Sequence, residues 1–176
     1  MNLYRVGDKL LDKDKIYRTI EEIIALRTEG LSQQEVANRL CIDRTFISRL
    51  EGIGEVYRGG KIGVIGFPIA NKVELENLLQ EEGVEFHLVM TEEERINFVS
   101  QKSGVELLND IMDLTAEART CDALIIIGSN YRIKVCEALV AKEVVGVEIG
   151  ISPIQEDVYV DPEQIRKLTK MLRRDI

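Results

Sequence analysis

The apolar residues change their spacing at Lys61, and this change constrains the fold more than any other feature of the sequence. Between Lys15 and Glu51 they recur at helical spacing, which predicts amphipathic helices. After Lys61 they gather in short β-branched runs separated by helical stretches, which predicts alternating strands and helices. The sequence therefore predicts a helical unit followed by an α/β unit.

Capping signals divide the first unit into three short helices. Gly30 closes the first helix, because glycine tolerates left-handed backbone angles. Ser32 and Glu35 have the spacing of a capping box at the start of the second. Asp43 is placed to cap a third helix that begins near Arg44.

The second unit is expected to be a small doubly wound, mainly parallel α/β domain, so the fold class of the whole chain is α + α/β. Capping signals mark several of the helix starts. Within the longest helical stretch, Ser103 and Glu106 have the spacing of a further capping box, which divides the stretch into two helices. The expected strands are 61–67, 84–90, 123–128 and 144–150, and the expected helices are 71–82, 91–119, 130–142 and 162–174.

A glycine-rich segment separates the two units. Four glycines between residues 52 and 60 predict a hinge, with domains at 1–52 and 61–176 and the hinge at 53–60. A rival interpretation pairs Val56-Tyr57 with Ile62-Gly63 across Gly59-Gly60 as a hairpin belonging to the first unit.

The segment LSQQEVANRLCIDRTFISRLE, residues 31–51, carries the most specific pattern in the chain. Ala37 is the small residue where two helices would cross, Ile42 lies in the turn, and Ile47 and Leu50 anchor the second helix. On these residues the segment resembles the helix-turn-helix of Cro-type and lambda-repressor-type transcriptional regulators. One residue departs from that pattern: Cys41 stands at the turn position where the family usually has glycine.

The resemblance implies binding to double-stranded DNA by a homodimer, since single helix-turn-helix units usually work in pairs on two half-sites. The second helix would read bases and the start of the first would contact phosphate, with Arg39 and Arg58 in support. The alternative is a three-helix bundle that contacts proteins. The residues implied to contact DNA are Gln33, Arg39, Arg44, Thr45, Ser48 and Arg49.

A ligand site is expected in the second unit, where strands of an open α/β sheet end. Gly128, Ser129 and Asn130 lead from a strand into a helix, an arrangement that suits a phosphate or carboxylate. The same residues also suit helix capping alone. The expected partner is a small anionic effector, and the candidate residues are Phe67, Asn71, Gly128, Ser129, Asn130 and Arg132.

The sequence offers little for catalysis, so we expect no enzyme, and no cofactor or metal. It has no third glycine for a dinucleotide fingerprint after Gly66 and no phosphate-binding loop motif. His87 is the only histidine and lies in an apolar strand, where a packed core role is expected. Cys121 and Cys136 are also expected in the core. An α/β enzyme with an appended helical domain stays open as an alternative, because fold alone does not settle function.

Charge and composition bear on partners and location. Residues 1–61 carry 11 Lys and Arg against 10 Asp and Glu, and residues 62–176 carry 12 against 21. The net charge of −8 argues against nonspecific adhesion to nucleic acid, so specificity would depend on a local basic cluster. There is no membrane-length apolar run and no disulfide pattern, so a reduced cytoplasm is expected and no membrane.

Overall fold

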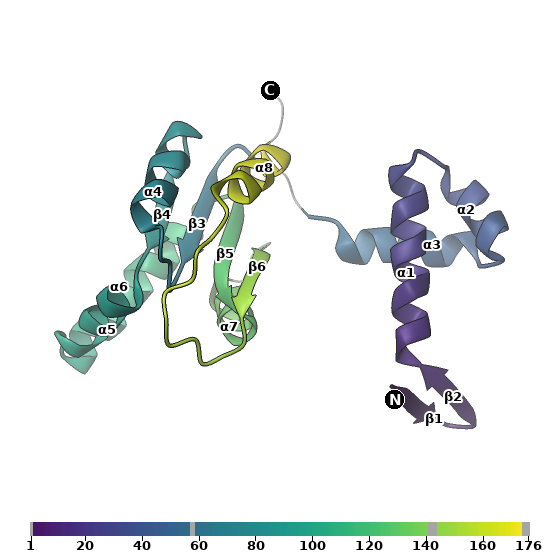
Figure 1. Ribbon diagram of the computed structural model, residues 1–176, viewed down its shortest axis with the longest axis horizontal. Coiled ribbons are helices and arrows are strands. Elements are labelled where there is room, and N and C mark those ends of the chain that lie inside the picture. Colours follow the sequence, from purple (N-terminus) through teal and green to yellow (C-terminus); the bar gives the residue numbers. More distant parts are fainter. Residues whose placement is uncertain (1, 57–58, 141–143, 174–176) are drawn as a thin grey trace. The chain divides into compact units, whose positions relative to one another are not determined.

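The computed structural model describes residues 2–56, 59–140 and 144–173, and it divides into two compact units, Met1–Glu55 and Val56–Ile176 (Figure 1). Each unit has buried apolar clusters of its own. A helical unit followed by a mixed unit is the division that the spacing of the apolar residues predicts.

Three helices form most of the first unit: α1 (Lys13–Thr28), α2 (Gln33–Leu40) and α3 (Arg44–Gly54). Their starts confirm the predicted capping. The Ser32 hydroxyl accepts from the Glu35 amide while the Glu35 carboxylate accepts from the Ser32 amide, and Asp43 caps α3. Gly30, after α1, has a φ of 97°, which agrees with its predicted role.

A two-stranded antiparallel hairpin, β1 (Leu3–Val6) and β2 (Lys9–Asp12), precedes α1 and was not predicted. In its register Leu3 faces Asp12 and Tyr4 faces Leu11, so each face of the hairpin mixes apolar and charged residues. The strands therefore lack the alternation by which a half-buried strand is recognised. The Asp12 carboxylate then caps α1 by accepting from the amides of Asp14 and Lys15.

The core of the first unit lies where the three helices meet. Its buried members come from all three helices, and partly buried residues close its edges. The cluster consists of Ile23, Leu26, Val36, Ala37 and Ile47, with Leu31, Leu40, Ile42 and Leu50 packed against it.

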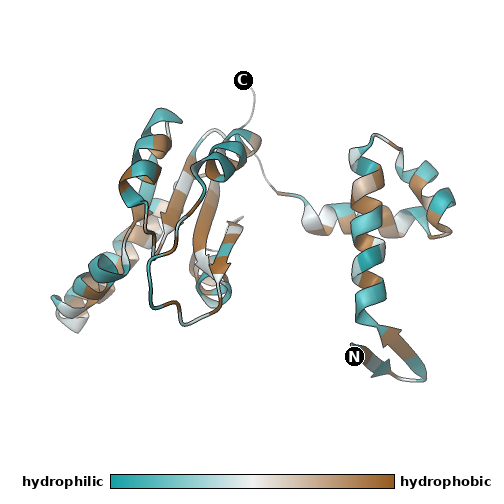
Figure 2. Cartoon of the chain, viewed as in Figure 1, coloured by the Kyte–Doolittle hydropathy of each residue, from teal (hydrophilic) through white to brown (hydrophobic). Residues whose placement is uncertain are grey.

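The second unit contains the predicted parallel sheet, with four strands in the order β4-β3-β5-β6. In Figure 2 the colour of these strands marks them as largely hydrophobic. All three neighbouring pairs are parallel, and the strands lie within one or two residues of the predicted runs. The strands are β3 (Ile62–Gly66), β4 (Phe86–Val89), β5 (Ala123–Ser129) and β6 (Val144–Gly150).

Helices cover both faces of this sheet, as a doubly wound domain requires. Leucines of α4 and apolar residues of α8 pack on one face, while the end of α6 and α7 pack on the other. The predicted break between α5 and α6 is present, with a capping box at Ser103 and Glu106. The helices are α4 (Lys72–Glu81), α5 (Glu92–Ser100), α6 (Gly104–Ala118), α7 (Asn130–Val140) and α8 (Pro162–Leu172).

The glycine-rich segment differs from the expected hinge at both ends. Helix α3 continues through Gly54. At the other end the Gly59 amide donates to the Leu172 carbonyl oxygen, and the amides of Gly60 and Lys61 donate to the Asp122 carboxylate. Residues 59–61 are thus bonded to the second unit.

The rival hairpin is not formed at Ile62 and Gly63, because both residues belong to β3 and pair with β5. Tyr57 and Arg58 lie outside the described residues. Residues 141 and 142 of the predicted helix 130–142 and residue 174 of the predicted helix 162–174 also lie outside the described residues. Helix α8 itself ends at Leu172, with Arg173 as its C-cap, so the prediction ran past its end.

Candidate nucleic-acid interface

The α2–α3 pair is held by a short turn and a small crossing residue. Cys41 has φ 54° and ψ 43°, the left-handed conformation, and the Ile42 amide donates to the Ala37 carbonyl oxygen at 3.1 Å. Ala37 and Ile47 are both buried in the cluster between the helices. A larger side chain at Ala37 would push the helices apart.

This packing leaves one face of α3 exposed, and four of the six residues implied to contact DNA lie on it: Arg44, Thr45, Ser48 and Arg49. Asp43 accepts hydrogen bonds from the amide and the hydroxyl of Thr45. The hydroxyl bond is the main reason why the pKa of Asp43 is below its ordinary value. The Thr45 hydroxyl is thereby oriented at the first turn of the helix.

The two remaining residues lie on α2. Arg39 is exposed in the last turn, and no salt bridge ties it to another described residue. Gln33 is half-buried at the first position, and its amide donates to the Glu51 carboxylate at 2.6 Å. The amide nitrogen of Gln33 is therefore bonded within the unit, and its amide oxygen is available to a partner.

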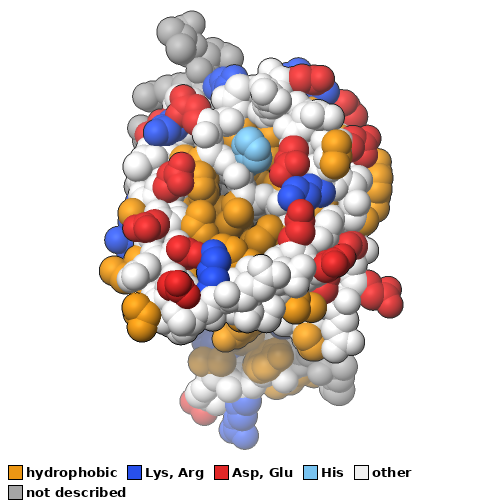
Figure 3. All heavy atoms as spheres, turned by 90° about the vertical axis from the view of Figure 1, so that its left-hand side faces the viewer, with side chains coloured by type: hydrophobic (Ala, Val, Ile, Leu, Met, Phe, Trp, Pro, Cys, Tyr) orange, Lys and Arg blue, Asp and Glu red, His pale blue; other side chains and the backbone are white. Residues whose placement is uncertain are grey.

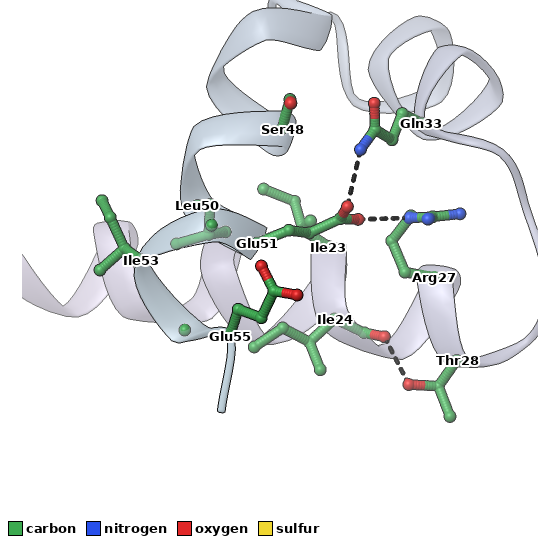
Figure 4. A pocket seen from close by; sticks show the side chains of 12 residues that line it. Ile23, Ile24, Arg27, Thr28, Gln33, Ser48, Leu50, Glu51, Ile53 and Glu55 are labelled. Atoms are coloured by element: carbon green, nitrogen blue, oxygen red, sulfur yellow. Dashed lines mark hydrogen bonds and ion pairs between the residues drawn. The ribbon is translucent and has the colours of Figure 1, made fainter. Parts of the chain in front are cut away.

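Glu51 joins all three helices, a feature that the sequence pattern did not reveal (Figure 4). Arg27 of α1 donates to it at 2.5 Å from one side, and Gln33 of α2 from the other. These bonds hold the pKa of Glu51 below its ordinary value, and the bond from Arg27 has the larger effect. Arg27 and Glu51 are 24 residues apart, so only the packing of α1 against α3 brings them together.

A cavity of about 770 Å³ lies beside this network, between α1 and the end of α3 (Figure 4). Gln33 and Ser48 line it together with the network residues. Its apolar wall includes Ile24 and Ile53, which are 56% and 85% exposed. The predicted DNA-contacting residues thus border a surface that is partly apolar.

In the second unit, the strand order changes direction between β3 and β5, where open α/β sheets take up ligands. Phe67 follows β3, and Arg132 lies in the first turn of α7, after β5. The Arg132 guanidinium lies over the Phe67 ring at 5.1 Å and donates to the Phe67 carbonyl oxygen at 3.2 Å. The structure therefore brings these two candidates together.

The other polar candidates make bonds within the protein. Asn71 donates to the Val160 carbonyl oxygen and accepts from the Val160 amide, so it ties α4 to the segment before α8 and does not cap α4 with its side chain. Ser129 is buried and accepts from the Arg132 amide, and Asn130 accepts from the Tyr131 amide. Gly128 faces the Arg132 side chain and the Phe67 carbonyl group.

Arg132 is the charged residue among these candidates. It is half-buried and has no ion pair within the part of the chain that the structure describes. Burial, and after it the nearby charge of Arg95, lowers its pKa from the ordinary arginine value, and the nearby Glu92 carboxylate opposes part of this shift. An anion bound to this guanidinium would offset both the cost of burying its charge and the repulsion by Arg95.

The interpretation of His87 as a core residue is wrong. His87 is exposed, because β4 is an edge strand and its apolar neighbours Phe86 and Val89 fill the inner positions. Cys121 is buried and Cys136 half-buried, as predicted for packed residues. Among the described residues there is no group of three His, Cys, Asp or Glu side chains that could hold a metal ion. None of the helices described is long and apolar enough to cross a membrane.

Comparisons of the chain with protein-family models, curated protein sequences and solved structures gave no significant match.

Proposed function

We propose that the chain is a sequence-specific DNA-binding transcriptional regulator, in which α2 and α3 act as a helix-turn-helix and α3 enters the major groove. The observation that carries the proposal is the α2–α3 pair. The left-handed turn at Cys41 and the buried Ala37 and Ile47 fix the pair, while the opposite face of α3 stays exposed.

The exposed face of α3 carries the chemistry of base readout. Arg44 and Arg49 are exposed, with no salt bridge to the other described residues, so both guanidinium groups are available. Arginine can bond bidentately to guanine, which is worth about 1–3 kcal/mol of discrimination per base. Gln33 and Arg39 on α2 would contact phosphates and set the register.

The second unit is proposed to regulate this binding through a small anionic effector. Arg132, beside Phe67 at the change in strand order, supports this part of the proposal because it is half-buried and forms no salt bridge with another described residue. Inorganic phosphate is the first probe. It should raise the melting temperature of the wild-type chain but not that of Arg132→Gln, and equal shifts would exclude Arg132 as the anion site.

The decisive experiment is selection of genomic DNA fragments by the purified full chain, run beside Arg44→Ala/Arg49→Ala. We expect the wild type to enrich a palindromic site. The double variant should lose at least about 30-fold in affinity for that site, since two bidentate contacts of about 1–3 kcal/mol each are removed. A matched control is Lys134→Ala/Lys167→Ala, which removes two exposed charges from the second unit.

The outcome separates readout from bulk charge. Loss of the site in the α3 variant alone supports the proposal. An equal loss of affinity in both variants would mean that the net charge of the protein, and not α3, determines binding. Unchanged affinity in the α3 variant would refute the role of α3. Selection of no DNA at any salt concentration would favour a three-helix unit that contacts protein instead.

A further inference from the structure

Thr45 lies at the centre of the exposed face of α3. Ile47 is buried in the core of the first unit and Leu50 packs against that core. Successive residues of an α-helix are about 100° apart, so Thr45 lies on the side of the helix opposite both. Thr45 is exposed there, in the first turn of α3. The first residues of a recognition helix are the ones that meet base edges in the major groove.

The hydroxyl proton of Thr45 is already donated within the protein. Asp43 is exposed and its pKa lies below the ordinary value, so at neutral pH its carboxylate is ionised and can only accept hydrogen bonds. In the bond between the two side chains, the Thr45 hydroxyl is therefore the donor. A hydroxyl group has one proton and two lone pairs. What the Thr45 side chain offers to a partner is thus an acceptor.

Asp43 offers a second acceptor beside it. The bonds from the Thr45 amide, at 2.6 Å, and from the Thr45 hydroxyl both end on the Oδ1 atom of Asp43. The Oδ2 atom forms no hydrogen bond or ion pair with any other residue that the structure describes. After the bonds from Thr45, the charge of Arg49 also lowers the pKa of Asp43, so the carboxylate lies within reach of the field of that arginine. The side chains of Asp43 and Thr45 together present acceptors and no free donor.

The bases of DNA differ in whether they can donate to such a pair. In the major groove adenine N6 and cytosine N4 carry amino groups, which donate, whereas guanine O6 and thymine O4 only accept. A carboxylate that faces O6 or O4 leaves both acceptors without a donor, which is costly once water is excluded. An acceptor pair at the start of α3 therefore favours an amino base over a keto base.

We propose that Asp43 and Thr45 form an acceptor pair that selects an amino base, adenine or cytosine, at one position of each DNA half-site. The inference deepens the proposed function and rests on it, because it names the base chemistry that the start of α3 recognises. It makes Asp43 a readout residue besides its role as the cap of α3. It also adds a preference that arginine contacts to guanine do not supply.

The test is the base preference of Asp43→Asn. The purified full chain first selects its site, and affinities are then measured for sites in which amino and keto bases are exchanged at each position in turn. At one position the exchange should cost the wild type about tenfold in affinity. Asparagine keeps an oxygen that caps α3 and replaces Oδ2 by an amide group that donates. In Asp43→Asn the loss should therefore disappear or reverse at that position alone.

Asp12→Asn is the matched control. Asp12 caps α1 by accepting from the amides of Asp14 and Lys15, so this substitution removes the same charge from a helix cap of the same unit. It should leave every base preference unchanged. A change of preference that both variants share would come from charge or capping alone and would overturn the role of Asp43.

Two variants of Thr45 test the hydroxyl group separately. Thr45→Val keeps the shape of the side chain and removes the hydroxyl, so discrimination between amino and keto bases at the same position should weaken. Thr45→Ser keeps the hydroxyl and should retain the discrimination. Equal discrimination by Thr45→Val and the wild type would overturn the acceptor pair.

Failure of this inference and failure of the proposed function give different results. If the wild type selects a DNA site and Asp43→Asn shows the same preference at every position, the acceptor pair is overturned and the DNA-binding function stands. If the wild type selects no DNA, or if Arg44→Ala/Arg49→Ala keeps its full affinity, the proposed function fails and the acceptor pair fails with it.

Discussion

Single residues of the first unit show how local geometry fixes the proposed recognition element. Cys41 is the sole non-glycine residue with positive φ among those the structure describes. Its left-handed backbone turns the chain from α2 into α3, and for a residue with a Cβ atom this conformation costs about 1–2 kcal/mol. The turn position, where the resembling family usually has glycine, thus demands a specific backbone conformation.

Cys41→Gly should stabilise the first unit. Glycine removes the Cβ penalty but loses more backbone entropy on folding, so a net gain of about 0.5–1 kcal/mol is expected. Urea unfolding measures it. Cys41→Ala keeps a Cβ atom and should give no such gain, so equal stabilisation by both variants would show that the effect does not come from the backbone.

At the scale of elements, ties between residues distant in sequence hold the helices in place. Glu51 connects α3 to α1 and α2 through Arg27 and Gln33, and Asn71 connects α4 to the backbone of Val160. The Asn71 bonds replace those that the Val160 backbone would otherwise make to water. The position of an element therefore depends on a few side chains at its ends.

The tie at Glu51 predicts a pH dependence of stability. Because the folded state lowers the pKa of Glu51, its contribution is complete above the ordinary glutamate pKa of about 4.3 and is lost as the pH falls through the lowered value. Glu51→Gln should thus melt below the wild type at neutral pH. Thermal melting followed at decreasing pH should show this difference disappear in acid.

Glu35 and Asp43 also have lowered pKa values, owing first to side-chain bonds with Ser32 and Thr45. The wild type and Glu51→Gln both retain these two carboxylates. The difference between wild type and variant therefore isolates Glu51. A difference that persists unchanged at the lowest pH would show that the carboxylate charge does not stabilise the helices.

At the scale of the whole molecule, two separate cores predict two separate unfolding events. The first unit is built on the cluster around Ile47, and the second on clusters packed against both faces of the sheet. Units with their own cores can unfold independently. The glycines between them carry no side chains that could extend either core.

Ile47→Ala should lower the melting transition of the first unit and leave that of the second in place. Ile47 is fully buried, so the cost should be about 2–5 kcal/mol. Leu79→Ala is the matched variant in the second unit and should act on the other transition. Scanning calorimetry distinguishes the two. A single transition that shifts with either variant would mean that the units unfold together.

Features with short-range causes were predictable from the sequence alone. The capping boxes at Ser32 and Ser103 need only residues three apart. The central strands β3 and β5 could be predicted because burial on both faces makes them continuously apolar. The candidate residues on α3 could be named because helical spacing puts them opposite Ile47. The hairpin before α1 escaped prediction because its apolar residues do not alternate.

The tertiary structure decided what depends on residues far apart in the chain. His87 lies in an apolar run, yet it is exposed (Figure 3) because β4 is at the edge of the sheet. The residues of one strand do not show where that strand lies in the sheet. The Glu51 network and the Asn71 bonds likewise arise only when elements far apart in the chain pack together. The sequence by itself thus determined the helices, the strands of the parallel sheet and the exposed face of α3, because neighbouring residues set them. Packing determined which polar groups stay free, because a hydrogen-bond partner can come from any part of the chain.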